Sequence, residues 1–102
     1  MNYLPENLKF EEGVAFMNDF SLLDIASEHG TPLYVYDWEN IKNNISEFTT
    51  SFGNETLYRY AAKAFICKKL VMLLDENNWG VDVVSGGEMA TVLSAVGTLE
   101  NT

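Results

Sequence analysis

A chain of 102 residues has room for one small domain, and a complete eight-fold β/α barrel of roughly 250 residues cannot fit in it. Its residues are 47% apolar and 13% aromatic, which is typical of a globular protein and excludes disorder along the whole chain. Six basic against 15 acidic residues give a net charge of −9, which argues against nucleic acid or an anionic membrane surface as a partner.

Several classes of site and location are also disfavoured. Cys67 is the one cysteine and His29 the one histidine, so neither an internal disulfide nor a zinc site of these residues is expected. No apolar run approaches the length of a membrane span. The first residues, MNYLPENLKFEEG, lack a cationic stretch followed by an apolar one, so no secretory signal is expected. We expect a cytoplasmic protein.

The first third of the chain predicts a weakly structured lead-in and one helix. Residues 1–18 have little periodicity and are predicted to be irregular, with a short strand near Val14–Met17. Ser21 is a typical N-cap with an acidic residue three positions later, and apolar residues follow it. Gly30, followed by a proline two residues on, predicts the end of this helix.

The next segment predicts a strand and then an amphipathic helix. Leu33–Tyr36 (LYVY) has the aromatic and β-branched composition of a strand, and Asp37 can cap the helix that follows. The helix is predicted from the clearest periodicity in the chain, and Gly53 closes it. Its apolar stripe consists of Trp38, Ile41, Ile45, Phe48 and Phe52.

Strands and helices then alternate to the end of the sequence. Strands are predicted at about 56–62 and 81–84, and helices at about 66–77 and 87–96. The helices have apolar faces, which are Leu70, Leu73 and Leu74 in the first and Met89, Val92, Leu93 and Val96 in the second. Such alternation predicts parallel strands joined by right-handed crossovers. Together with the strand predicted at Leu33–Tyr36, these make three strands, which would form an open sheet with two free edges. We therefore expect the opening of a longer α/β protein.

Lys63 is the first candidate for chemistry. It ends a predicted strand among Ala61, Ala62 and Ala64, and active sites in α/β folds gather at the carboxyl ends of strands. Partial desolvation there lowers the pKa of an amine and favours the neutral nucleophile that forms a Schiff base. A plain surface lysine is the alternative interpretation.

The second candidate is the segment VDVVSGGE, which runs from a strand into a helix. Its paired glycines free backbone N–H groups to approach a ligand, although a simple tight turn is the favoured interpretation of two glycines alone. Asp82, if buried in its strand, needs a partner, for which Lys63 is the candidate. Glu88 in the first helical turn is interpreted as a capping residue, and Tyr60 lies near enough to Lys63 in the sequence to line the same pocket.

Three blocks together resemble one family. Gly30–Asp37 (GTPLYVYD), Tyr60–Ala64 (YAAKA) and Asp82–Glu88 (DVVSGGE) are similar in order and spacing to the opening of the diaminopimelate decarboxylases, and the resemblance covers residues 20–96. Phe65 departs from it, since many members have asparagine there. The family's phosphate-binding glycines, the acid that pairs with the pyridine nitrogen and the ring-stacking histidine would lie beyond residue 102.

The resemblance implies a fold and a site. The fold class would be α/β, the N-terminal portion of a β/α (TIM-type) barrel that is incomplete in this chain. Residues 1–36 would be a lead-in and a strand of the family's β-domain, whereas residues 37–102 would be the first β/α units of the barrel. Lys63 would bind pyridoxal 5'-phosphate covalently. Asp82 would lie beside that lysine and the cofactor ring, and Ala61 and Ser85 would line the pocket.

The resemblance also implies an activity. A longer protein containing this chain would decarboxylate meso-diaminopimelate to L-lysine, as a homodimer acting on a small amino-acid substrate. A related amino-acid decarboxylase of the same fold class is the alternative within the family, and a non-catalytic truncated or interaction module is the alternative outside it. The 102-residue chain alone is expected to be inactive.

Overall fold

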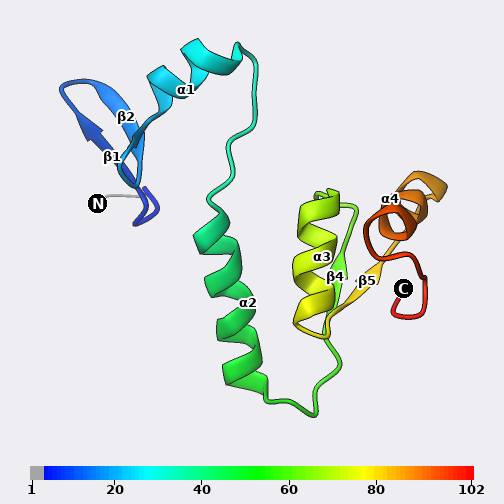
Figure 1. Ribbon diagram of the computed structural model, residues 1–102. Helices are drawn as coiled ribbons and strands as arrows, with labels where there is room; N and C mark the ends of the chain where they lie inside the picture. The colour runs from blue at the N-terminus through cyan, green and yellow to red at the C-terminus, as the bar shows by residue number, and fades with distance from the viewer. Residues whose placement is uncertain (1–3) are drawn as a thin grey trace. The chain divides into compact units, whose positions relative to one another are not determined.

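A computed structural model describes residues 4–102, which form two compact units, one up to Glu47 and one from Phe48 to Thr102. Figure 1 labels most of the elements, and their order along the chain is as follows. The elements are β1 (Leu8–Glu11), β2 (Val14–Met17), β3 (Phe20–Ser21), α1 (Leu22–His29), α2 (Trp38–Phe52), β4 (Arg59–Ala61), α3 (Lys68–Glu76), β5 (Gly80–Asp82) and α4 (Gly86–Val96).

The first unit opens with a small antiparallel sheet in the order β1-β2-β3. The strand predicted at Val14–Met17 is confirmed as β2, but the irregular lead-in predicted over residues 1–18 is wrong for β1. Glu12 and Gly13 connect β1 to β2 with φ angles of 51° and 81°. Two consecutive positive φ angles are typical of the tightest hairpin turns, in which asparagine and glycine predominate. Because Glu12 stands where asparagine is usual, the sequence does not show the signal from which this hairpin could be predicted.

Helix α1 begins and ends where the capping residues predict. The Ser21 hydroxyl oxygen accepts a hydrogen bond from the Asp24 N–H at 3.2 Å. Gly30, with φ of 83°, donates its N–H to the Ala26 carbonyl at 2.8 Å. Since four N–H groups of a helix start lack partners within the helix, the serine cap satisfies one of them and fixes the boundary.

The strand predicted at Leu33–Tyr36 is wrong. This segment belongs to no helix or strand, and Tyr34 is 90% exposed. A strand exists only when a neighbouring strand accepts and donates its backbone hydrogen bonds, and the sheets of the part of the chain that the structure describes do not include this segment. The composition of residues 33–36 therefore favours a strand, but this segment pairs with no strand within residues 4–102.

The long helix is confirmed with its predicted limits. α2 runs from Trp38 to Phe52, and the carboxylate of Asp37 accepts the N–H of Asn40 at 3.1 Å. Gly53, with φ of 82°, closes the helix by donating its N–H to the Thr49 carbonyl. Of the predicted stripe only Ile45 is buried.

The second unit is built on two parallel strands, which are two of the three that the strand–helix alternation predicts. β4 pairs with β5, with Tyr60 opposite Val81 and Ala61 opposite Asp82. Both strands are shorter than predicted, three residues each. Their helices α3 and α4 follow them and contact one another, and α3 also contacts β5. The core of this unit consists of Ala62, Leu70, Val71, Leu74, Val81 and Val92.

Two details of the second unit extend the prediction. Met89 and Leu93 remain 40% and 46% exposed, so only part of the apolar face predicted for α4 is covered. The N–H of Val81 donates to the carbonyl of Asn101 at 2.9 Å, so backbone also lies along β5 near the end of the chain. Among the described residues, no helix has the length and apolarity needed to cross a membrane.

Candidate functional site

Lys63 lies in a turn immediately after β4. The Ala64 N–H donates to the Ala61 carbonyl at 3.2 Å, which closes the turn over Ala61–Ala64. Within it Ala62 is 2% exposed and its N–H donates to the Asp82 carbonyl at 3.0 Å, whereas Lys63 is exposed. The buried alanine anchors the turn to β5 and leaves the amine of Lys63 accessible.

Ala61 and Asp82 lie side by side on one face of the β4–β5 pair. They are Cα partners in the parallel register, and both are exposed. Their neighbours Ala62 and Val81 are buried, as expected for side chains that alternate between two faces. The opposite face is therefore the covered one, and the Ala61–Asp82 face is open at the end where Lys63 follows.

The condition under which Asp82 would need Lys63 as a partner is not met in this chain. Asp82 is exposed, so it needs no partner to offset desolvation. Among the ion pairs formed within residues 4–102, none joins Lys63 to Asp82. The backbone brings the two residues to neighbouring strand ends, while their side chains face solvent.

Ser85 and Glu88 form a reciprocal cap at the start of α4. The Glu88 N–H donates to the Ser85 hydroxyl oxygen at 3.1 Å, and the Ser85 hydroxyl donates to Glu88 Oε2 at 2.7 Å. The interpretation of Glu88 as a capping residue is confirmed. The role of Ser85 as N-cap was missed, although serine followed by glutamate three residues later is the known capping-box signature.

The surroundings of three further residues, Tyr60, Cys67 and His29, are also defined. The hydroxyl of Tyr60 donates to the carbonyl of Phe65 at 2.7 Å, which ties the end of the Lys63 loop to β4. Cys67 is half-buried and precedes α3. His29 is exposed in the last turn of α1, and its Nε2 lies 3.8 Å from the Glu28 carboxylate.

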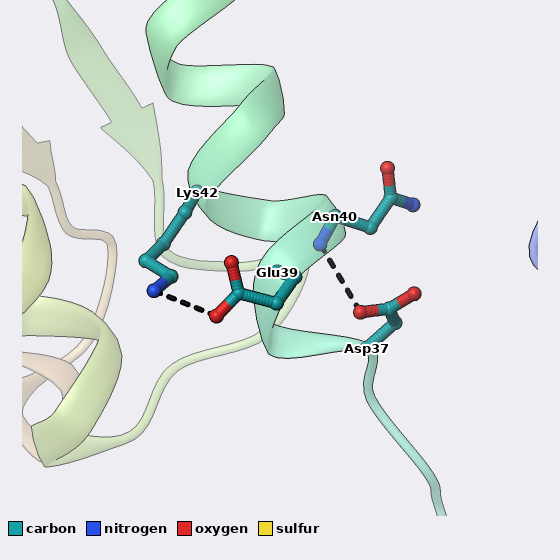
Figure 2. Close-up of polar contacts among 4 residues, drawn as sticks. All are labelled: Asp37, Glu39, Asn40 and Lys42. Atoms are coloured by element: carbon teal, nitrogen blue, oxygen red, sulfur yellow. Dashed lines mark hydrogen bonds and ion pairs between the residues drawn. The ribbon is translucent and has the colours of Figure 1, made fainter. Parts of the chain in front are cut away.

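A second polar cluster, in the first unit, surrounds Asp37. Its Oδ2 accepts the side-chain amides of Asn7 and Asn18 at 2.8 and 2.9 Å, and its Oδ1 accepts the Asn40 N–H. The Asn7 amide first, then the Asn18 amide, holds the pKa of Asp37 below its ordinary value, because both stabilise the charged form. Figure 2 shows the bond from the Asn40 N–H to Asp37, beside the ion pair of Glu39 and Lys42, whose charged atoms are 2.7 Å apart.

The Asp37 cluster does not have the composition of a metal centre. Three of its members are asparagines, and two of these direct amide N–H groups at the carboxylate. No group of three or more histidine, cysteine, aspartate or glutamate residues within 4–102 is placed to hold a metal ion. The cluster is a structural junction between the hairpin and the start of α2.

Comparison with known proteins identifies the family. Residues 38–101 match the family described as "pyridoxal-dependent decarboxylase, pyridoxal binding domain". The chain belongs to this family. It is 40% identical over 95 residues to diaminopimelate decarboxylase of Mycobacterium leprae, an alignment that covers 92% of this chain and 20% of that protein.

Solved structures support the same assignment. A crystal structure of an Aquifex aeolicus protein superposes with a TM-score of 0.77 at 38% identity, covering 88% of this chain and 22% of that one. The crystal structure of diaminopimelate decarboxylase from M. jannaschi gives a TM-score of 0.68 at 31% identity, with the same shares covered. The chain therefore has the α/β fold of the N-terminal part of these decarboxylases, and it spans about a fifth of the length of the relatives that it matches.

Proposed function

We propose that this chain is the N-terminal part of a diaminopimelate decarboxylase, which converts meso-diaminopimelate to L-lysine and CO2. The names of the matched relatives support the reaction, and the pyridoxal-dependent family supports the cofactor. Residues 37–102 would be the first β/α units of the pyridoxal phosphate-binding barrel, and residues 1–36 would lead in from the β-domain. The parallel β4–β5 pair and the family match that begins at residue 38 favour this division.

Lys63 is the residue that would hold pyridoxal 5'-phosphate. It bears an accessible primary amine at the carboxyl end of a parallel strand, and an amine is the group that bonds to the aldehyde of this cofactor. A Cβ added at Gly86 would meet no atom within 4 Å, so the start of α4 leaves open space at the same end of the sheet. These residues fit the cofactor, which when bound supplies an electron sink for the electron pair left by departing CO2.

The neighbouring residues have separate roles in this proposal. Asp82 is the last residue of β5, the strand that pairs with β4 just before Lys63. A carboxylate near an amine favours the protonated form of the amine. Ala61 lies opposite Asp82, and its side chain is a single methyl group. A side chain of this size would leave room for a planar ring above the strand. Ser85 would line the pocket from the start of α4.

The partners follow from the same proposal. The substrate would be a small amino acid, the enzyme would act in the cytoplasm, and the longer protein would be a homodimer. The family description names no substrate, so a related amino-acid decarboxylase differs from our proposal only in which amino acid is consumed. The relatives' printed names favour diaminopimelate.

Borohydride trapping tests the assignment of Lys63. In the longer protein that contains this chain, borohydride should reduce the bond between lysine nitrogen and cofactor carbon, and the peptide carrying Lys63 should gain the cofactor's mass. K63A should abolish this labelling and CO2 release, whereas K68A, which removes an exposed lysine from the first turn of α3, should retain both. Labelling that survives K63A would place the cofactor on another residue.

The choice of substrate is tested separately. The wild-type protein should release CO2 from meso-diaminopimelate at least tenfold faster than from other basic amino acids at equal concentration. A preference for another amino acid would contradict the proposed substrate and leave the cofactor assignment intact.

A further inference from the structure

Two tyrosines hold the loops at the two ends of β4. Tyr58, just before the strand, donates its hydroxyl proton to the Gly53 carbonyl at 2.6 Å, five residues back. Tyr60, within the strand, donates its hydroxyl proton to the Phe65 carbonyl at 2.7 Å, five residues on. Both tyrosines are half-buried. One bond therefore fixes the loop that enters β4, and the other fixes the loop that leaves it.

The Tyr60 bond reaches across the residue that would carry the cofactor. On one side of Lys63, the Ala62 N–H donates to the Asp82 carbonyl at 3.0 Å, which ties the turn to β5. On the other side, the Phe65 carbonyl is held by the Tyr60 hydroxyl. Lys63 thus lies between two points at which its backbone is anchored to the strand pair.

The register of the strand pair places Tyr60 behind this loop. Tyr60 pairs with Val81, which is 4% exposed, so its ring lies on the covered face, opposite to the face that bears Ala61. A tyrosine side chain has only two rotatable bonds before its rigid ring, so its hydroxyl has a fixed reach. The ring therefore acts on the loop through the backbone and leaves the open face to a ligand.

We propose that Tyr60 is a positioning residue, whose hydroxyl holds the Phe65 carbonyl and thereby fixes the backbone that presents the Lys63 amine. The proposal rests on the proposed function, because it concerns how readily Lys63 bonds to pyridoxal 5'-phosphate. In that step the Lys63 nitrogen adds to the aldehyde carbon, a C=N bond replaces the C=O bond, and the oxygen leaves with both amine protons as water. A lysine side chain is flexible, so a fixed backbone reduces the entropy lost in bringing its amine to the aldehyde.

Two phenylalanine variants of the longer protein that contains this chain separate positioning from stability. Y60F removes only the hydroxyl that bonds to Phe65, and its ring still fills the covered face. Y58F is the matched control, because it removes the same kind of bond from the other end of β4. It keeps the ring that stacks on Trp79, with 4.9 Å between the ring centroids.

The readout is the rate at which the cofactor-free protein binds added pyridoxal 5'-phosphate at Lys63, followed by absorbance and located by borohydride trapping. Y60F should load about three- to tenfold more slowly than the wild type, the factor that corresponds to one ordinary hydrogen bond. Y58F should load at the wild-type rate. The melting temperature should fall in both variants, since each loses one hydrogen bond, so lower stability alone does not produce the difference in rate.

The possible outcomes are distinguishable. Loading of Y60F at the wild-type rate overturns the positioning role and leaves the proposed function standing. Equal slowing in Y58F and Y60F also overturns it, because loss of stability would then be the cause. A wild-type protein that gains no borohydride label at Lys63 overturns the proposed function and this inference with it.

Discussion

Asp37 shows how one side chain can organise a unit that has a small core. Its two carboxylate oxygens accept hydrogen bonds from Asn7, which precedes β1, from Asn18, which follows β2, and from Asn40 in the first turn of α2. The same residue therefore caps a helix and fixes both ends of a hairpin. The contacts are charge-assisted, since the carboxylate is ionised, and such bonds are stronger than neutral ones.

The lowered pKa of Asp37 predicts a pH dependence of stability. Because the pKa is lower in the folded state than in the unfolded state, the stabilisation is complete above the unfolded value and is lost as pH falls through the folded one. Thermal unfolding followed by circular dichroism should show a melting temperature that falls on acidification in the wild type. D37N, which keeps a capping oxygen, should melt lower at neutral pH and depend less on pH in the acid range.

The control for this prediction is D19N, which removes an aspartate that makes none of the Asp37 contacts. It should retain the acid-dependent fall of the wild type. Equal pH dependence in D37N and in the wild type would show that the three asparagine contacts do not stabilise the folded state.

The sequence predicted the helix-capping residues better than it predicted which side chains are buried. Ser21, Asp37 and Glu88 were predicted as caps, because capping depends on residues within one turn of helix. Whether Asp82 is buried could not be read from the sequence in the same way, because burial depends on what covers the strand, and Asp82 is exposed. The positions of Lys63, Ala61, Asp82 and Ser85 at one end of the β4–β5 pair follow from the alternation of strands and helices, whereas their roles stay predictions.

At the scale of whole elements, local signals again predicted more than pairing did. α1 and α2 were predicted within a residue, since caps and an apolar stripe are both local. Leu33–Tyr36 has the composition of a strand and forms none, and β1 forms a strand that its composition did not indicate. Both errors concern strand pairing: residues 33–36 have no partner strand within 4–102, and the turn that joins β1 to β2 lacks the usual asparagine–glycine signal.

Gly80 at the start of β5 provides a test of this packing. A Cβ there would lie 2.7 Å from the Asn101 carbonyl oxygen and 3.1 Å from Arg59 Nη1. G80A should therefore displace the backbone near Asn101 and lower the free energy of unfolding of the second unit by about 1–3 kcal/mol. Chemical denaturation of G80A against the wild type measures this difference.

Gly86 is the matched control, because a Cβ added to it meets no atom within 4 Å and it is in the first turn of α4. G86A should be neutral or slightly stabilising, since alanine favours helix over glycine. If G80A were as stable as G86A, the contact between Asn101 and β5 would not persist in solution.

Across the described residues, several large apolar side chains are exposed to solvent. The face of β4–β5 that bears Ala61 and Asp82 is open, and Val84 just beyond it is 71% exposed. In the first unit Phe20 and Tyr34 are 68% and 90% exposed. The chain spans about a fifth of the length of the relatives that it matches, and in the longer protein proposed above other segments would cover this apolar surface.

The last prediction follows from that open face. The purified 102-residue chain should bind pyridoxal phosphate weakly and release no CO2 from meso-diaminopimelate, because the face bearing Lys63 is open to water and one strand pair encloses no pocket around a cofactor. The native product from the source cell should be about five times heavier than 11.5 kDa, in proportion to the share of the relatives covered, and should catalyse the reaction. Mass spectrometry and a CO2-release assay on both samples measure this. Turnover by the short chain would show that the two strand ends suffice for catalysis, and the barrel proposed above would then not be required for the chemistry.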